Sequence, residues 1–64
     1  MFKVNFTHWI GGDVVYWYEE VGSNLEEMKS AARTEWASRH GQVRFRLSKA
    51  IGSGQYEVVE EFTK

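Results

Sequence analysis

The side chains that could carry out chemistry in this chain are few and scattered along the sequence. The only imidazoles are His8 and His40, and there is no cysteine, so the spacing predicts no metal site. Ser53 lies between two glycines and lacks the strand-to-helix context of a nucleophile elbow. Glu19 and Glu20 are adjacent and would point to opposite faces of a strand, so they cannot act as a carboxylate pair. We therefore expect neither an enzyme nor a bound cofactor.

Aromatic side chains are the most informative feature of the composition. The 64 residues include three Trp, three Tyr and four Phe. A chain of this length buries only about 60% of the surface that its unfolded form exposes. Some rings are therefore expected on a face that meets another molecule, and Trp, Tyr and Arg are the residue types enriched at the centres of protein interfaces.

Charge and length exclude several classes of protein. The formal net charge is −1, with acids and bases almost balanced, whereas a general binder of polyanions is usually basic and a DNA mimic needs a large acidic excess. No apolar run approaches the roughly 20 residues of a membrane span. The first six residues alternate like a strand and lack the apolar stretch of a signal peptide. With no cysteine, the chain fits a reducing cytoplasm, and we expect one domain over residues 1–64.

Hydrophobic periodicity predicts four strands and one helix. Alternating or β-branched and aromatic runs predict strands at residues 2–9, 14–19, 43–47 and 56–62, with glycine turns at 11–13 and 52–54. A helix is predicted at about residues 24–39, because either Ser23 with Glu26 or Asn24 with Glu27 could form a capping box. Gly41 suits the left-handed position after its last turn. The expected fold is α+β, a ββαββ chain with one helix on one face of a four-stranded antiparallel sheet.

The two hairpin turns predict which side chains share a face. A turn at Gly11–Gly12 places Phe6 opposite Trp17, and a turn at Gly12–Asp13 shifts the pairs by two and keeps the faces. A turn at Gly52–Ser53 places residues 47 and 58, 43 and 62, and 44 and 61 opposite one another. The predicted covered face contains Phe2, Val4, Phe6, Val15, Trp17, Val43, Phe45, Leu47, Tyr56, Val58 and Phe62, beneath Leu25, Met28, Ala32 and Trp36. The predicted open face contains Trp9, Val14, Tyr16, Tyr18, Arg44, Arg46, Glu57, Val59 and Glu61. A bulge in either hairpin would break this assignment locally.

The open face is the candidate site for a partner. Its expected binding residues are Trp9, Tyr16, Tyr18, Arg44, Arg46 and Val59. Three uses are open: binding of another protein, stacking of single-stranded nucleic acid on the rings with the arginines at phosphates, and self-association as a structural homodimer. Glutamates opposite the arginines would weaken the field that phosphate needs, so a protein partner is favoured over nucleic acid. Glu19, Glu20, Glu26 and Glu27 either cap the helix or form an acidic rim that steers a basic partner.

Part of the chain resembles a family of small bacteriophage proteins. The stretch Asn24-Leu25-Glu26-Glu27 to Trp36, followed by Val43-Arg44-Phe45-Arg46, is similar in layout to the phage inhibitor of bacterial RNA polymerase, in which a capped helix precedes a strand with alternating arginines. The likeness covers about a third of the chain, which departs from that family in its fourth strand and its aromatic second strand. The resemblance implies a cytoplasmic inhibitor or adaptor that occludes a bacterial host protein. It also implies that Arg44 and Arg46 contact that protein.

Overall fold

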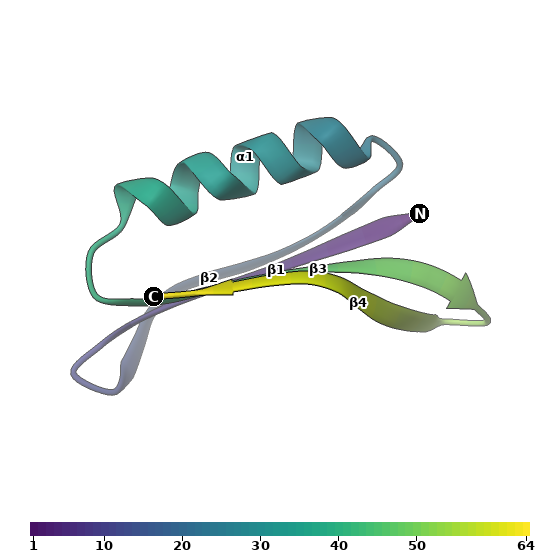
Figure 1. The fold of residues 1–64 in the computed structure, drawn as a ribbon. Helices are drawn as coiled ribbons and strands as arrows, with labels where there is room; N and C mark the ends of the chain where they lie inside the picture. The colour runs from purple at the N-terminus through teal and green to yellow at the C-terminus, as the bar shows by residue number, and fades with distance from the viewer.

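One helix lies on one face of a four-stranded antiparallel sheet (Figure 1). The computed structural model describes residues 1–64. Its elements are β1 (Phe2–Ile10), β2 (Asp13–Gly22), α1 (Leu25–Ser38), β3 (Gln42–Gly52) and β4 (Gln55–Thr63). The strand order is β2-β1-β3-β4, so β1 and β3 are central and β2 and β4 are the edges. The predicted α+β fold with ββαββ order is confirmed.

The start of the helix uses the second of the two predicted capping boxes. Asn24 is the N-cap residue, and its side-chain oxygen accepts a hydrogen bond from the Glu27 backbone N–H at 3.0 Å. This bond satisfies one of the N–H groups that the first turn leaves without a partner. After the helix, Gly41 has a φ of 102°, and a Cβ there would lie 3.2 Å from the Trp9 carbonyl oxygen. Glycine is therefore required where the chain turns back into β3.

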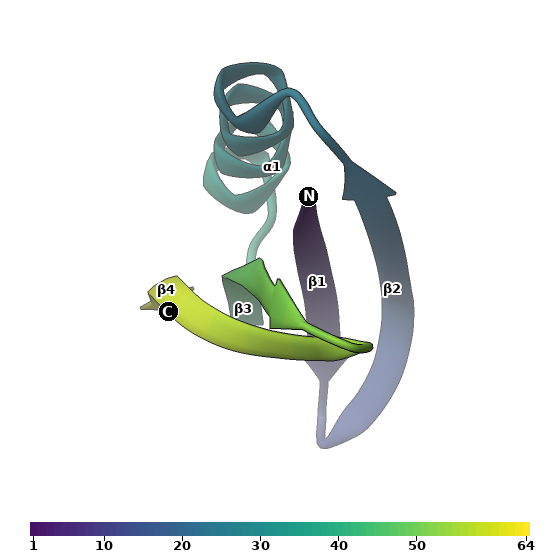
Figure 2. The same ribbon diagram turned by 90° about the vertical axis from the view of Figure 1, so that its right-hand side faces the viewer.

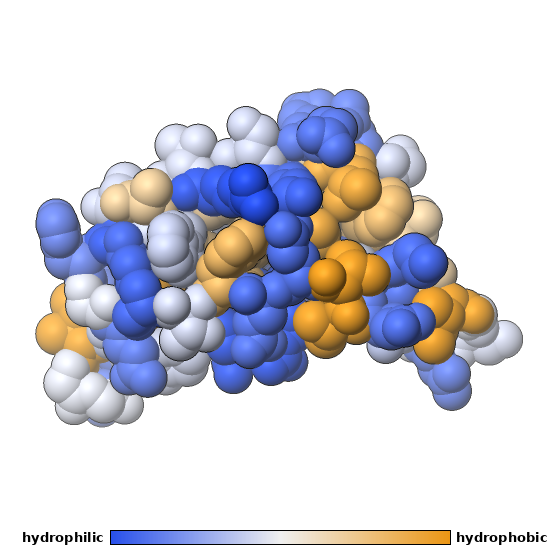
Figure 3. Space-filling model, viewed as in Figure 1, coloured by the Kyte–Doolittle hydropathy of each residue, from blue (hydrophilic) through white to orange (hydrophobic).

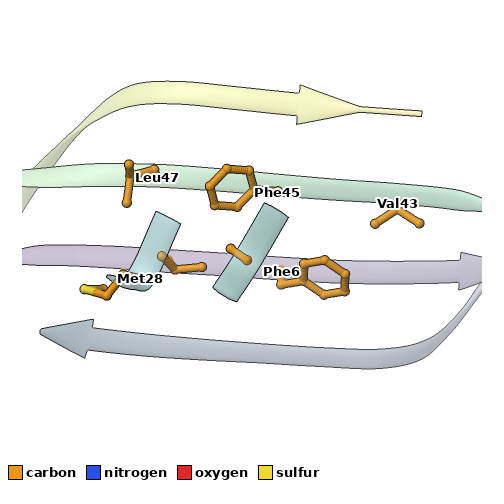
Figure 4. Packing of buried hydrophobic residues seen from close by; sticks show 7 residues of the cluster. Phe6, Met28, Val43, Phe45 and Leu47 are labelled. Carbon is orange, nitrogen blue, oxygen red and sulfur yellow. The ribbon is translucent and has the colours of Figure 1, made fainter. Parts of the chain in front are cut away.

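The core lies between α1 and the two central strands (Figure 4). Its buried side chains are Val4, Phe6, Met28, Ala32, Val43, Phe45 and Leu47, all of them predicted for the core. The Phe45 ring stacks on that of Phe62, with 5.6 Å between ring centres. Phe2, Tyr18, Leu25, Trp36 and Phe62 are partly buried around this cluster. The alternation in the central strands therefore predicts the core correctly.

A bulge in β2 overturns the predicted faces of that strand. Phe6 pairs with Tyr18 and His8 with Tyr16, but Trp9 pairs with Val14, which leaves Val15 as an extra residue. One extra residue moves every following side chain to the other face. Trp17, predicted for the core, is instead 67% exposed on the open face, and Val15 is also exposed. Tyr16 and Tyr18, predicted for the open face, lie on the helix side.

Packing on the helix side explains why β2 adopts the bulged register. The Tyr18 ring stacks on Phe6, with 5.4 Å between centres, and Tyr16 meets the same ring edge-on at 6.1 Å. Further along β2, a Cβ on Gly22 would lie 3.0 Å from the Met28 sulfur. The bulge therefore directs two large rings onto Phe6 and places the smallest residue of the strand beneath the methionine.

The second hairpin has two irregularities and a different register from the predicted one. Gly52 pairs with Gln55 around a loop at Ser53–Gly54, and the register shifts at Ile51 and again at Val59. The predicted pairs of residues 47 with 58, 43 with 62 and 44 with 61 are therefore wrong, because residues 47, 45 and 46 face residues 60, 62 and 61. Tyr56 and Val58 move to the open face, and Glu57 to the helix side.

The observed register of β4 places Glu60 on the helix side, where ion pairs join β4 to α1. The Glu60 carboxylate lies 2.9 Å from the Lys29 ammonium and 3.0 Å from the Arg33 guanidinium. Seen from the β4 side, the surface where helix and sheet meet is mainly hydrophilic at its centre (Figure 3).

Figure 2 shows that the sheet is strongly twisted and that β2 stands to the side of the helix. The edge of β2 is thus left uncovered.

Candidate partner-binding face

Side chains on the open face, the side of the sheet away from α1, form rows that cross the strands. Register places one row at Trp17, Thr7, Arg44 and Thr63, the next at Glu19, Asn5, Arg46 and Glu61, and the third at Val21, Lys3, Ser48 and Val58. A further pair, Val14 and Trp9, lies beside the first row. The two tryptophans therefore lie together at one end of the face, and polar side chains cross its middle.

We name Trp9, Val14, Trp17 and Arg44 the tryptophan patch. Trp17 is the most exposed large apolar side chain of the molecule, at 67%, and Val14 is also exposed. Trp9 is half-buried, and the Arg44 guanidinium carbon lies 5.4 Å from its ring centre. A cation over an indole face is attracted by the ring quadrupole. The patch thus presents one free indole, one indole stacked with a cation, and a β-branched side chain.

The two arginines of β3 differ in their partners. Arg46 donates from Nε to the Glu61 carboxylate at 2.7 Å, so its charge is balanced within the sheet. The four ion pairs of the molecule do not include Arg44. In the same row as Arg46, Asn5 donates to Glu19 at 2.8 Å. The patch therefore carries one uncompensated positive charge beside a row whose polar groups are already paired.

The structure brings together some of the predicted site residues and separates others. Trp9, Arg44 and Arg46 lie on the open face, as predicted. Tyr16 and Tyr18 lie on the helix side, and Val59 is the exposed extra residue of the β4 bulge. Trp17 was missed because no residue type in Val14–Tyr18 marks the position of the bulge.

A buried histidine ties the end of the helix to β1. The His8 Nε2–H donates to the His40 carbonyl at 2.6 Å, and Nδ1 accepts from Arg39 at 3.3 Å. Arg39 also donates to the Glu35 carboxylate from Nε at 3.1 Å, and its guanidinium carbon lies 4.1 Å from the Tyr16 ring centre. Both ring nitrogens are engaged, which fixes one neutral tautomer. His8 therefore has a structural role in joining strand and helix.

Two ionisable groups have displaced pKa values, and both lie on the helix side. Burial, followed by the nearby Glu20 carboxylate, raises the pKa of the Tyr18 phenol. The hydrogen bond from Lys29 lowers the pKa of the Glu60 carboxyl, with smaller contributions from the charges of Lys29 and Arg33. Neither group faces the tryptophan patch.

The hollows of the molecular surface are shallow and hold no group of metal-ligating side chains. One is lined by Arg33, Trp36, Ala37 and Phe62. The indole N–H of Trp36 is buried and has no hydrogen-bond partner. No three His, Cys, Asp or Glu side chains come together as metal ligands. The single helix lacks the length and apolar character needed to cross a membrane.

Comparison of the chain with protein-family models, with curated proteins and with solved structures found no match.

Proposed function

We propose that this chain is a protein-binding module that uses the tryptophan patch to cover part of a partner protein. The observation that supports the proposal most is the position of Trp17, which is 67% exposed beside Trp9 and the unpaired Arg44. Complete burial of a large apolar side chain contributes roughly 1.5–3 kcal/mol. Because the patch lies on a paired sheet rather than a loop, little ordering is required when a partner covers it.

The surroundings of the patch resemble the rim of an interface. The next row of side chains holds the Asn5–Glu19 and Arg46–Glu61 hydrogen bonds, which remain satisfied when the patch is covered. A central aromatic anchor surrounded by polar groups is the usual anatomy of a binding hot spot. We therefore assign Trp17 as the anchor, Trp9 and Arg44 as its neighbours, and Arg46 to the rim.

The proposed setting is inhibition or adaptation of a bacterial protein by a phage or mobile element, in the host cytoplasm. This part of the proposal rests on the likeness of the helix and arginine strand to phage inhibitors of RNA polymerase. Of the two arginines that the likeness implicates, Arg44 is free to contact a partner, whereas Arg46 is held by Glu61. Occlusion of a host surface requires no catalytic group.

A second candidate function is binding of single-stranded nucleic acid through the same patch. Two indoles and an unpaired arginine could stack bases and contact phosphate. The carboxylates of Glu19 and Glu61 argue against binding of nucleic acid, because they lie in the adjacent row and weaken the positive electrostatic field around Arg44. Contacts to phosphate weaken steeply with salt, so the ionic-strength dependence of binding separates the two candidates.

The test compares two substitutions on the open face. Trp17→Thr keeps a residue suited to strands and removes the anchor, and Val58→Thr makes a matched change in the third row. Each variant is immobilised, and the bacterial proteins that it retains from a lysate are quantified against the unaltered chain. We expect Trp17→Thr to lose the retained protein and Val58→Thr to keep it. Equal retention by both variants would contradict the proposal. Retention of nucleic acid that is lost as the salt concentration rises would favour the second candidate, since contacts to phosphate weaken with salt.

A further inference from the structure

Charges are segregated between the central and the edge strands. The edge strand β2 carries Asp13, Glu19 and Glu20, and the edge strand β4 carries Glu57, Glu60 and Glu61, with no Lys or Arg in either. The central strands β1 and β3 carry Lys3, Arg44, Arg46 and Lys49, with no Asp or Glu. A net charge close to zero therefore conceals two acidic edges around a basic centre.

The acids of the two edges differ in how they are balanced. On β4, Glu60 pairs with Lys29 and Arg33, and Glu61 pairs with Arg46. On β2, no carboxylate belongs to any of the four ion pairs of the molecule. Glu19 accepts a hydrogen bond only from the neutral amide of Asn5. The negative charge along β2 is therefore uncompensated.

The edge of β2 is also the more regular of the two. Residues 16–22 pair with β1 without interruption, whereas the bulge at Val59 divides β4 near its middle. None of the four backbone hydrogen bonds outside the helix and strand ladders involves β2. Strand edges are commonly protected by lysine or proline, and β2 contains neither. Its outer N–H and C=O groups are thus available to another strand.

We propose that the edge of β2 accepts an extended basic segment of a partner protein, which adds to the sheet as a fifth strand. Backbone hydrogen bonds would supply the attachment, and side chains would supply the selection. Lys or Arg side chains on the added strand would lie beside Glu19 on the open face or beside Glu20 on the helix side. There, Glu20 and Glu27 line one hollow with Gly22 and Asn24.

Charge argues against a second copy of this chain as the occupant. Pairing β2 with another β2, or with β4, would bring two acidic strands together, and like charges across strands are destabilising. This inference concerns the outer backbone groups of β2, which adjoin the tryptophan patch, and does not depend on the function proposed above.

The probe is a capped peptide of alternating lysine and valine, Lys-Val-Lys-Val-Lys-Val-Lys, titrated into the isotope-labelled chain at low salt. We expect the largest amide shifts, and slower hydrogen exchange, at residues 16–22. The same peptide with glutamate in place of lysine should not bind. Two further versions carry N-methyl groups, one on its lysines and the other on its valines, so each has the N–H groups along one edge blocked. Strand addition uses only one edge of the peptide, so one of these versions should fail to bind and the other should still bind.

Paired variants locate the charges that select the peptide. Glu19→Gln combined with Glu20→Gln should weaken the peptide by up to about fivefold, since the alternating lysines share one face and the exposed charge contact on that face is removed whichever face it is. Glu57→Gln makes the same chemical change on the other edge and should leave the affinity unchanged. Shifts confined to β4 or to the open face, or equal binding of both N-methylated peptides, would overturn the proposal. A chain that forms β2–β2 dimers and ignores the peptide would likewise overturn it and assign the edge to a second copy.

Discussion

The rings of Phe6 and Tyr18 lie parallel across β1 and β2, with 5.4 Å between their centres and 5° between their planes. This contact can form only in the bulged register, because an unbulged strand would turn Tyr18 to the opposite face. The pair therefore links the packing of the core to the identity of the exposed ring, Trp17.

The first prediction separates the two registers by stability. Tyr18→Ala removes a stacked ring from Phe6 and should lower the free energy of unfolding by roughly 2 kcal/mol. Trp17→Thr changes an exposed side chain and should alter it by less than about 0.5 kcal/mol. Urea unfolding of both variants measures the difference. A larger loss for Trp17→Thr than for Tyr18→Ala would show that Trp17, and not Tyr18, is packed beneath the helix.

The second prediction concerns the helix residue Trp36, whose ring lies 5.9 Å from that of Phe62. Trp36→Ala should destabilise the fold by about 3 kcal/mol, the lower end of the range for a large aromatic, because the side chain is only partly buried. Trp36→Phe should cost much less, since it keeps a ring and removes the buried indole N–H that has no partner. Thermal unfolding followed by circular dichroism tests both, and equal losses would show that the indole N–H is satisfied.

The third prediction concerns acid. The pKa of Glu60 is lowered in the folded chain by the hydrogen bond from Lys29, so its ionised form stabilises the fold. This contribution is present above the ordinary glutamate pKa of about 4.3 and is lost as the pH falls through the lowered value. The difference in stability between the unaltered chain and Glu60→Gln should therefore shrink below that pH. A difference that is constant from neutral to strongly acidic pH would contradict the Lys29–Glu60 contact.

The fourth prediction concerns alkali. Burial raises the pKa of Tyr18 in the folded chain, so the folded state holds the phenolic proton more tightly than the unfolded state. The resulting stability is present below the ordinary tyrosine pKa of about 10 and is lost as the pH rises from there through the raised value. Tyr18→Phe should lose less stability over that interval. The ultraviolet absorbance of tyrosinate should show one late-titrating group that this variant lacks.

The fifth prediction distinguishes the two arginines of β3. Arg46→Gln breaks the pair with Glu61 and should destabilise the fold by up to about 1 kcal/mol while leaving partner binding largely intact. Arg44→Gln has no carboxylate to release and loses only the contact with the Trp9 ring, so it should lower stability by no more than about 1 kcal/mol while weakening binding. Unfolding and binding are measured on both variants. The opposite pattern would place Arg46, and not Arg44, at the interface.

The central part of the fold was predictable because each strand there offers one apolar set of side chains. In β1 and β3 the residues Val4, Phe6, Phe45 and Leu47 alternate with polar ones, so only one face can be buried. In β2 both sets are apolar or aromatic: Val15 and Trp17 compete with Tyr16 and Tyr18. Periodicity cannot choose between them, and the choice depends on contacts with Phe6 and with the end of the helix. For this reason the fold and the open-face residues of the central strands were predicted, whereas the side chains that β2 contributes to the open face were not.

The bulge at Val15 decides which aromatic side chains of β2 lie on the open face. The central pair β1–β3 has no irregularity, so the contacts between these two strands are the same whichever face of β2 is turned toward the helix. Deletion of Val15 would remove the bulge and keep Thr7 opposite Trp17 and Phe6 opposite Tyr18, so the indole would stay on the open face. A regular strand that retained Val15 would instead pair Phe6 with Trp17, hiding the indole and presenting two phenols without any change of amino-acid type. The bulge thus selects one of two surfaces that the same sequence could present on this scaffold.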